Sequence, residues 1–291
     1  MSFLQYLING ISLGSVYAII ALGYTMVYGI AKMLNFAHGD VIMVGAYVIF
    51  TIISTMGYPP IVGVIVAVAL CTVLGIIIER IAYKPLRGAS SLAVLITAIG
   101  VSYFLQNMAL IVFGADTKSF NSIVKFGPFH LGGLVISGET LVTIVSCIII
   151  MIILTTFINK TKAGQAMLAV SEDKGAAVLM GINVNQTIAL TFAIGSGLAA
   201  IAGALLCSAY PTLSPYTGSM PGIKAFTAAV FGGIGSIPGA FVGGILLGVI
   251  EIFGKAYISS QLSDAIVFAV LIIVLIVKPS GILGKNRQEK V

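Results

Sequence analysis

The sequence has 291 residues, of which 59% are hydrophobic and 8% are charged, with a mean hydropathy of +1.13. Soluble domains carry about 25% charged residues, so this composition excludes an ordinary water-soluble domain and predicts a protein solvated by membrane lipid. The net charge of +6 does not predict nucleic-acid binding, because the basic residues lie at the ends of apolar segments, where the positive-inside rule and anionic lipid account for them.

Apolar segments fill nearly the whole chain, and a bilayer crossing takes about 20 residues. They predict an all-α integral membrane protein, a polytopic helical bundle of about eight transmembrane helices. One further apolar piece, Ala225–Ile234, is too short to cross unaided and predicts a broken or re-entrant segment. The eight expected spans are Phe3–Ile30, Val41–Met56, Ile61–Ile78, Leu92–Phe113, Thr140–Ile158, Gln186–Tyr210, Ile237–Phe253 and Ala265–Val277.

Lysine and arginine gather in three segments: Glu79–Arg87, Asn159–Gly181 and the tail after Val277. The positive-inside rule predicts that all three, and therefore the C-terminus, lie in the cytoplasm. For the tail to lie there, Ala225–Ile234 has to complete a crossing. The glycine-rich run that follows it is a suitable break, because irregular backbone is tolerated at membrane depth where protein or a cavity covers it.

Polar residues also gather between the first two spans, where there is barely a loop. Asp40 lies just before an apolar run and suits a helix N-cap. For Asn35 and His38, contact with a transported solute in a cavity and plain packing both remain open. Neither a second histidine nor a carboxylate at ligand spacing accompanies them, so no metal site is predicted. The residues predicted to line a translocation path are Asn35, His38, Gly39, Gly232 and Gly233.

The longest cytoplasmic segment, residues 159–183, predicts a short exposed helix. Ser171 is expected to cap this helix, with Glu172 and Asp173 in its first turn, where acidic side chains favour the positive end of the helix dipole. Gly181 is expected to close it. Its Ala, Leu and Met surface suits a partner's groove. The alternative is a helix that merely connects two spans.

The remaining polar residues within spans predict structural roles. Gln106 and Asn107 are expected to bond across helices, and Glu251 is expected to pair with Lys255 four residues later, near a membrane interface. The sequence holds no P-loop, catalytic triad or carboxylate pair. It therefore predicts no enzyme, no catalytic residue and no cofactor bound by this chain.

Motifs spread over nearly the whole chain resemble the permeases of branched-chain amino acid ABC transporters, of the LivH type. The resemblance begins in Leu22–Gly29 and Asn35–Gly39, continues in Lys224–Val230, and ends in Lys278–Gly284. It implies a single ABC-transporter permease domain over residues 1–291, in a multi-pass protein of the bacterial inner membrane that imports branched-chain, hydrophobic amino acids.

The same resemblance implies partners, because this chain has no ATP site of its own. They are a second homologous permease subunit, two cytoplasmic ATP-binding subunits that use the ATP, and a periplasmic or lipid-anchored substrate-binding protein. Residues 159–183 would be the loop that couples the permease to the ATPases. Its coupling residues, by the resemblance, are Glu172, Asp173, Ala176, Ala177 and Gly181.

Two alternatives remain open at this point. One is an ATP-independent channel or facilitator for a small polar solute, although the sequence lacks a paired Asn-Pro-Ala or carbonyl-filter motif. The other is a related ABC permease for urea or short amides, because no residue in the sequence specifies a branched side chain.

Overall fold

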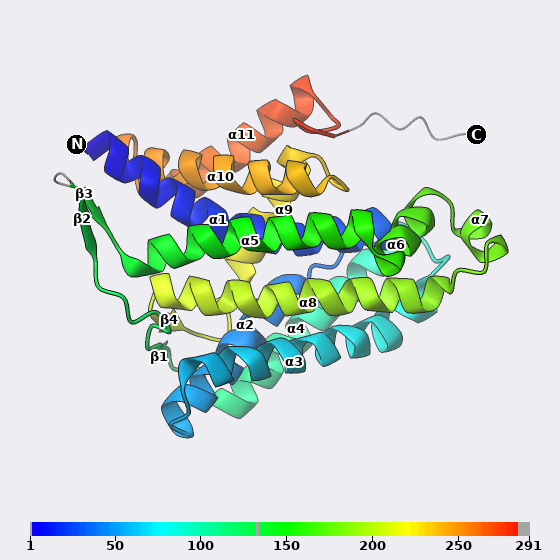
Figure 1. The fold of residues 1–291 in the computed structure, drawn as a ribbon, viewed down its shortest axis with the longest axis horizontal. Helices are drawn as coiled ribbons and strands as arrows, with labels where there is room; N and C mark the ends of the chain where they lie inside the picture. The colour runs from blue at the N-terminus through cyan, green and yellow to red at the C-terminus, as the bar shows by residue number, and fades with distance from the viewer. Residues whose placement is uncertain (1, 132–133, 285–291) are drawn as a thin grey trace.

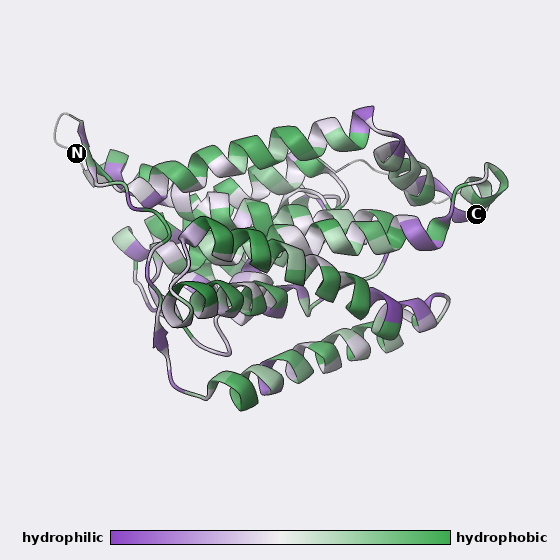
Figure 2. Ribbon diagram, turned by 60° about the horizontal axis from the view of Figure 1, so that its bottom comes forward, coloured by the Kyte–Doolittle hydropathy of each residue, from purple (hydrophilic) through white to green (hydrophobic). Residues whose placement is uncertain are grey.

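The computed structural model describes residues 2–131 and 134–284, and helices make up most of that part of the chain (Figure 1). The predicted all-α bundle is confirmed. Seven of the described helices are long and apolar enough to cross a membrane. Hydrophobic residues run along these helices, and hydrophilic ones gather towards their ends and in the connecting segments (Figure 2). The seven are α1 (Ser2–Ala31), α2 (His38–Phe50) with the π-helical turn η1 (Thr51–Thr55), α3 (Pro60–Ile78), α4 (Ser91–Phe113), α5 (Gly138–Lys160), α8 (Val184–Ala209) and α10 (Ile237–Tyr257).

Two shorter helices complete the membrane-spanning part. α11 (Ser263–Val277) has 15 residues and corresponds to the eighth expected span. α9 (Ser219–Gly232) has 14 residues and contains most of the apolar piece that was too short to cross unaided.

The bundle has two distinct ends (Figure 1). One end carries α6 (Lys162–Glu172) and α7 (Lys174–Leu179). The opposite end carries the start of α1 and two small antiparallel sheets. The short elements not yet named are η2 (Glu79–Tyr83), η3 (Lys84–Leu86), β1 (Lys118–Ser119) paired with β4 (Thr212–Leu213), and β2 (Phe129–Leu131) paired with β3 (Leu134–Ile136).

The three basic segments lie together at the α6–α7 end. Arg87 bonds to Asn185 at the start of α8, directly after the α7 segment. Leu168 of α6 and Leu283 of the C-terminal segment line the same cavity. The predicted common side for these segments is therefore confirmed, while its assignment to the cytoplasm stays a prediction.

The predicted crossing by a broken element is also present. α8 ends at the strand-bearing end, where the Phe120 amide donates to the Pro211 carbonyl over 3.2 Å. The chain then turns back and forms α9, whose last turn lies at the opposite end, because the Phe231 carbonyl accepts from the amide of Ile282 in the C-terminal segment (2.9 Å). A non-helical stretch and a short helix thus complete one crossing between them.

The central helix is α1, which is almost entirely buried. Its main neighbour is α10, and glycines bring the two backbones together. A Cβ on Gly14 would stand 2.6 Å from the Ile245 oxygen, and one on Gly10 would stand 2.8 Å from the Val249 Cα. Small residues where two helices meet permit such close packing. Within a membrane the hydrophobic effect does not drive helices together, so van der Waals contact between closely packed backbones stabilises the pair instead.

Candidate functional site

Two short helices, α2 and α9, begin inside the bundle with their N-terminal ends in contact. Each follows a long helix and a non-helical segment, Lys32–Ala37 before α2 and residues 211–218 before α9. A Cβ on Gly39 would stand 2.6 Å from the Gly218 oxygen and 3.2 Å from the Gly222 Cα. We call Gly39, Gly218 and Gly222 the glycine junction. Its backbones touch directly, so it holds the two helix starts in one fixed arrangement.

A buried glutamine bridges the two helix starts. Gln106 of α4 donates through Nε2 to the Asp40 carboxylate (2.8 Å) and to the Ser219 hydroxyl (3.2 Å). The predicted bond from Gln106 across helices is confirmed. The same prediction is wrong for Asn107, whose amide donates to the Tyr103 carbonyl of its own helix (2.7 Å).

The N-cap prediction for Asp40 is wrong as well. α2 begins two residues earlier, at His38, and Ala37 occupies the N-cap position without a side-chain bond. Asp40 therefore lies in the first helical turn, where a carboxylate still favours the positive end of the helix. Its partner is the Gln106 side chain from α4, which the local sequence does not reveal.

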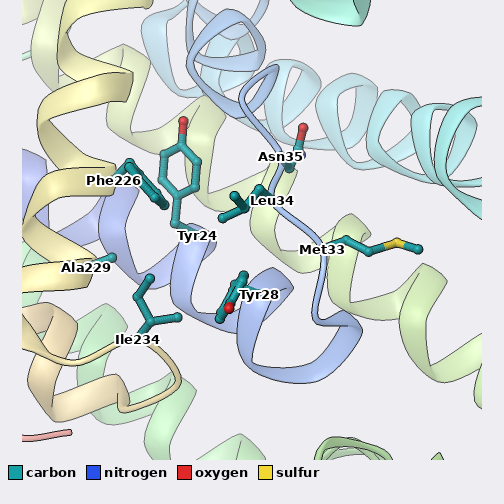
Figure 3. Close-up of a pocket in the computed structure, with 8 residues that line it drawn as sticks. All are labelled: Tyr24, Tyr28, Met33, Leu34, Asn35, Phe226, Ala229 and Ile234. Atoms are coloured by element: carbon teal, nitrogen blue, oxygen red, sulfur yellow. The ribbon is translucent and has the colours of Figure 1, made fainter. Parts of the chain in front are cut away.

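An aromatic pocket lies between α1, the Lys32–Ala37 segment and α9 (Figure 3). The Tyr24 and Phe226 rings meet edge to face, with centroids 5.7 Å apart. Apolar and aromatic side chains from α1, the Lys32–Ala37 segment and α9 thus enclose one narrow space. Its lining residues are Tyr24, Tyr28, Met33, Leu34, Asn35, Phe226, Ala229 and Ile234.

The structure separates the first three residues of the predicted path. Asn35 lines the aromatic pocket, and its Oδ1 also accepts a hydrogen bond from the Tyr83 hydroxyl (2.9 Å). His38 is buried behind the pocket, with its ring centroid 4.7 Å from that of Tyr24. Gly39 belongs to the glycine junction. Asn35 therefore borders the pocket and packs against Tyr83, and its contact with a transported solute stays a prediction, whereas the surroundings of His38 are those of a packing residue.

Gly232 and Gly233 lie at the C-terminal end of α9, between Ala229 and Ile234, which line the aromatic pocket. Gly233 has a φ of +107°, a conformation that favours glycine, and it ends the helix. The Gly232 carbonyl accepts from the Leu283 amide (2.9 Å), so the C-terminal segment packs against the break. Both glycines serve that contact and do not line the aromatic pocket.

A larger cavity of about 650 Å³ lies at the α6–α7 end, lined by parts of α1, α5, α6, the α9–α10 connection and the C-terminal segment. Ile234 lines both this cavity and the aromatic pocket. A single residue of the α9–α10 connection therefore borders a narrow apolar space on the inside and a wide one towards the end of the bundle.

A buried ionic cluster joins four helices near the strand-bearing end. The Glu251 carboxylate of α10 accepts from the Tyr17 hydroxyl (2.8 Å), Lys224 Nζ (2.8 Å) and Lys255 Nζ (2.6 Å). Lys224 also pairs with Asp264 of α11 over 2.7 Å. The predicted Glu251–Lys255 pair is confirmed, but it is part of a larger cluster. Sequence reasoning missed the cluster, and the one signal for it was a lysine inside an apolar segment.

The exposed segment after α5 forms two helices rather than one. Asp173 caps α7, because its Oδ1 accepts from the Ala176 amide (2.9 Å). Ser171, the predicted cap, instead donates to the Leu168 carbonyl inside α6 (2.7 Å). The cap prediction for Ser171 is wrong because α6 starts at Lys162 and continues through Glu172, so Glu172 ends one helix instead of opening the next.

The prediction that Gly181 closes this helix is confirmed. Gly181 has a φ of +79°, and its amide donates to the Val178 carbonyl (2.9 Å) while the Ile182 amide donates to the Ala177 carbonyl (3.0 Å). This pair of bonds is the Schellman motif, which glycine favours because its backbone adopts a positive φ without strain.

The surface of α7 is apolar and exposed to an unusual degree. Leu179 is 89% exposed and Met180 is 81% exposed, with Val178 beside them. Ala177 is buried and attaches the helix to the bundle. We call Val178, Leu179 and Met180 the α7 knob. α7 lies at one end of the molecule, beyond the end of α8 (Figure 1).

A lysine ties α7 to the end of the central helix. Lys174 donates through Nζ to the Ala31 carbonyl over 3.3 Å. Burial lowers the pKa of Lys174, and the nearby Arg87 charge lowers it further. The Lys32–Ala37 segment, which leads to the aromatic pocket, starts one residue after this bond. α7 is therefore linked to the pocket by one side-chain hydrogen bond and the Lys32–Ala37 segment that follows it.

The family described as "Branched-chain amino acid transport system / permease component" matches this chain over residues 6–275. The chain is 45% identical to the high-affinity branched-chain amino acid transport system permease protein BraD of Pseudomonas aeruginosa, over 99% of this chain and 98% of the relative. It is also 45% identical to the permease protein LivH of the same kind of system in Escherichia coli K12, with the same coverage.

A more distant relative and a solved structure complete the comparison. The chain is 29% identical to the probable branched-chain amino acid transport permease protein LivH of Methanocaldococcus jannaschii, over 93% of this chain and 89% of the relative. Among solved structures it is similar to a chain of PsaBC from Streptococcus pneumoniae in complex with Fab. The TM-score is 0.50 at 15% identity, covering 94% of this chain and 91% of that one, which is a likeness of fold alone.

Proposed function

Because this chain belongs to the family of permease components of branched-chain amino acid transport systems, we propose that it is the membrane-spanning subunit of an ATP-driven importer for branched-chain amino acids. It is a multi-pass membrane protein. In the proposed complex it resides in the bacterial inner membrane with its α6–α7 end in the cytoplasm. A second permease subunit, two ATP-binding subunits and a substrate-binding protein complete the importer.

The observation that carries the proposal is the α7 knob. An apolar surface of this exposure marks a site of interaction with another protein. A short helix of this kind fits a groove on a partner, as other helix-in-groove contacts do. In the proposed importer the partner is the ATP-binding subunit, and Glu172, Asp173, Ala176, Ala177 and Gly181 shape and orient the knob.

The proposed route of coupling starts at this knob. ATP-driven movement of the partner would displace α7, and the Lys174 bond would pass the displacement to the end of α1. From there it reaches the Lys32–Ala37 segment and the aromatic pocket. Such a mechanical step alternates access to a site between the two sides of the membrane.

The proposed translocation path includes the aromatic pocket and Asn35. The pocket is too narrow in this structure to hold a solute, so the proposal requires it to widen during transport. Its Tyr, Phe, Leu and Ile side chains would then contact an apolar amino-acid side chain, and the Asn35 amide would supply a polar contact. Urea and short amides remain the second candidate cargo. Competition for uptake by leucine, isoleucine and valine, with urea and acetamide as controls, separates the two classes.

The experiment that tests the proposed function is the double variant Leu179→Asp with Met180→Asp, purified from native membranes in mild detergent. We expect the variant to remain folded and monodisperse, because both side chains are exposed, but to lose the ATP-binding subunit at least tenfold.

The matched control is Phe126→Asp, which also places a carboxylate at an exposed apolar position, but in the connection between α4 and α5 at the strand-bearing end. This control is expected to keep the ATP-binding subunit. Full retention of that subunit by the double variant would contradict the assignment.

A further inference from the structure

The cavity at the α6–α7 end has the size of a small-molecule site, and we call it the end cavity. Its volume of about 650 Å³ falls within the range of about 300–1,000 Å³ in which proteins bind small ligands. Its walls include the last turns of α1 and α5 and the first turn of α10. Three helix termini therefore border one space.

These helix termini give the end cavity both signs of partial charge. α10 begins at the cavity with Ser236 as its N-cap, so the positive end of that helix lies there. α1 and α5 end at the same cavity and contribute Ile30 and Asn159 from their last turns, so their negative, carbonyl-bearing ends lie there too. A ligand that carries one anionic and one cationic group is complementary to this arrangement, because helix N-termini attract carboxylates and helix C-termini attract cations.

A buried hydroxyl group without a partner is a second, independent observation. Thr25 of α1 lines the end cavity and is 2% exposed, yet its Oγ1 forms no hydrogen bond with any residue that the structure describes. Other buried helical threonines donate to the carbonyl four residues earlier, as Thr187 and Thr191 do. A buried hydroxyl left without a bond costs about 1–3 kcal/mol, so Thr25 is suited to a ligand that supplies the bond.

The packing of α1 against α10 brings Thr25 to the positive end of α10. A Cβ on Gly29 would stand 3.1 Å from the Cα of Gly235, the residue before the Ser236 N-cap. Thr25 lies one helical turn before Gly29 on the same face of α1. Because α1 and α10 pack antiparallel, that turn of α1 lies beside the first turn of α10. The Thr25 hydroxyl and the start of α10 therefore border the same part of the end cavity.

The remaining side chains of the end cavity define the rest of the ligand. Among the described residues no carboxylate side chain lines it, and Lys32 is its one basic lining residue, which disfavours a ligand that carries only a positive charge. Aliphatic and thioether side chains provide a surface for a branched alkyl group. Those from α1, α6 and the C-terminal segment are Met26, Ile30, Met167, Leu168 and Leu283.

We propose that the end cavity is a binding site for a branched-chain amino acid in its zwitterionic form, entered from the α6–α7 side. The carboxylate binds at the start of α10 and accepts a hydrogen bond from the Thr25 hydroxyl. The ammonium group binds at the carbonyl ends of α1 and α5, and the alkyl group contacts the aliphatic lining. The choice of ligand rests on the proposed function, which supplies the cargo and the side from which it comes.

Occupancy of this site slows import. Ile234 borders both the end cavity and the aromatic pocket, so an amino acid in the end cavity lies on the route out of the pocket. Its binding also stabilises, by mass action, the state of the permease in which the end cavity is open. The amino acid that has accumulated on the α6–α7 side therefore inhibits its own import.

The site is tested by equilibrium binding of radioactive leucine to the complex purified through this chain, in detergent, without ATP and washed free of the substrate-binding protein. Thr25→Val removes the hydroxyl and keeps the shape of the side chain. Its matched control is Thr143→Val on α5, because Thr143 is 1% exposed and its hydroxyl also lacks a partner among the described residues, but it does not line the end cavity. We expect Thr25→Val to weaken leucine binding at least tenfold and Thr143→Val to leave it unchanged.

A second pair of variants fills the end cavity instead of removing a bond. Leu168→Trp adds bulk from α6, at a position that is 38% exposed, and is expected to abolish leucine binding. Leu190→Trp adds the same bulk on α8, at a position that is 39% exposed and outside the cavity lining, and is expected to retain binding.

Leucine analogues with a single charge test the zwitterion. Isocaproate is leucine without its ammonium group, and isoamylamine is leucine without its carboxylate. We expect both to bind at least tenfold more weakly than leucine. Binding of isocaproate as tight as that of leucine would overturn the inference, because it would identify a site for anions alone. Equal leucine binding by Thr25→Val and Thr143→Val would also overturn it.

Inhibition is measured in proteoliposomes that hold ATP in the lumen, with the α6–α7 end facing the lumen and the substrate-binding protein outside. The measure is the ratio of initial leucine uptake rates with and without unlabelled leucine in the lumen. We expect lumenal leucine to slow uptake at least fivefold in wild type and Thr143→Val, and to have little effect in Thr25→Val. Equal inhibition in the two variants would overturn the inference. ATP-driven uptake by wild type without lumenal leucine keeps that failure distinct from failure of the proposed function, which would abolish this uptake.

Discussion

Small residues shape both the glycine junction and the α7 segment, but for opposite reasons. At the junction, Gly39 and Gly218 bring two backbones into contact, and a side chain at either position has no space. At the end of α7, a Cβ on Gly181 would have nothing within 4 Å, and glycine is needed there for its positive φ. The first region needs glycine for its size, and the second needs it for its backbone conformation.

This difference distinguishes the glycine junction, which fixes part of the fold, from α7, which we propose moves with the ATP-binding subunit. The junction is buried on every side and fixes where α2 and α9 begin. α7 is a short helix, held by its cap, its Schellman motif, the buried Ala177 and one bond from Lys174. Substitutions at the junction should therefore affect folding first, and substitutions at α7 should affect assembly and coupling first. The predictions below run from the largest expected effect to the smallest.

Gly218→Val is expected to prevent folding, with a loss of more than about 4 kcal/mol, because its Cβ would overlap the Gly39 backbone. The measure is the fraction of monodisperse protein on size-exclusion chromatography in detergent. Gly100→Ala is the matched control, since its Cβ meets nothing and alanine favours a helix by about 1 kcal/mol. Normal folding of Gly218→Val would show that the close contact at the glycine junction is not required for folding.

Lys224→Met is expected to destabilise the protein by about 3 kcal/mol, because it leaves the buried Glu251 with one fewer cation. Asp264→Asn removes the other partner of Lys224, but Asp264 is half-exposed, so a change below about 1 kcal/mol is expected. Thermal unfolding in detergent compares the two. Equal losses of stability in the two variants would contradict this, because they would show that the Lys224–Asp264 pair, and not the Lys224–Glu251 pair, accounts for the contribution of Lys224.

Asp173→Ala is expected to cost about 1 kcal/mol at the start of α7, because the Ala176 amide loses its acceptor. The whole protein should remain folded, with faster amide hydrogen exchange confined to residues 174–181 and ATP-driven uptake reduced a few-fold. Asp173→Asn keeps a capping oxygen and is expected to retain both properties. Unchanged exchange in Asp173→Ala would show that the cap does not hold α7.

The smallest expected effect is the pH dependence that Lys174 contributes. Its pKa is lower in the folded protein than in the unfolded chain, so the unfolded state binds more protons between the two values. Its contribution to stability is therefore complete above the unfolded pKa of about 10.4 and is lost as the pH falls through the lowered folded pKa. The difference in thermal stability between wild type and Lys174→Met, followed from about pH 8 to about pH 11, measures it. A difference that does not change with pH would contradict the prediction.

Local features of the fold were predictable from the sequence. Each long apolar run became a span, and charge placement required α9 to complete a crossing, which it does. Gly181 was also predictable, because a Schellman closure depends on a few consecutive residues. In each case the deciding interaction is with lipid or with residues close in sequence.

The polar centres were less predictable because their partners lie far away in the chain. Asp40 looks like a cap until Gln106, 66 residues later, is placed beside it. Lys224 meets Glu251 only because α9 and α10 pack side by side after a glycine break. The residues predicted to line the translocation path lie apart for the same reason. Asn35 lines the aromatic pocket, whereas Gly233 packs against the C-terminal segment.

The measurement that tests the central claim most directly is leucine uptake into liposomes that contain the complex purified through this chain. With ATP supplied on the side of the α6–α7 end, the wild type is predicted to accumulate leucine. The Leu179→Asp and Met180→Asp double variant is predicted to fold normally and accumulate none. Leucine flux that needs no ATP and is equal in both proteins would contradict the account and identify a facilitator.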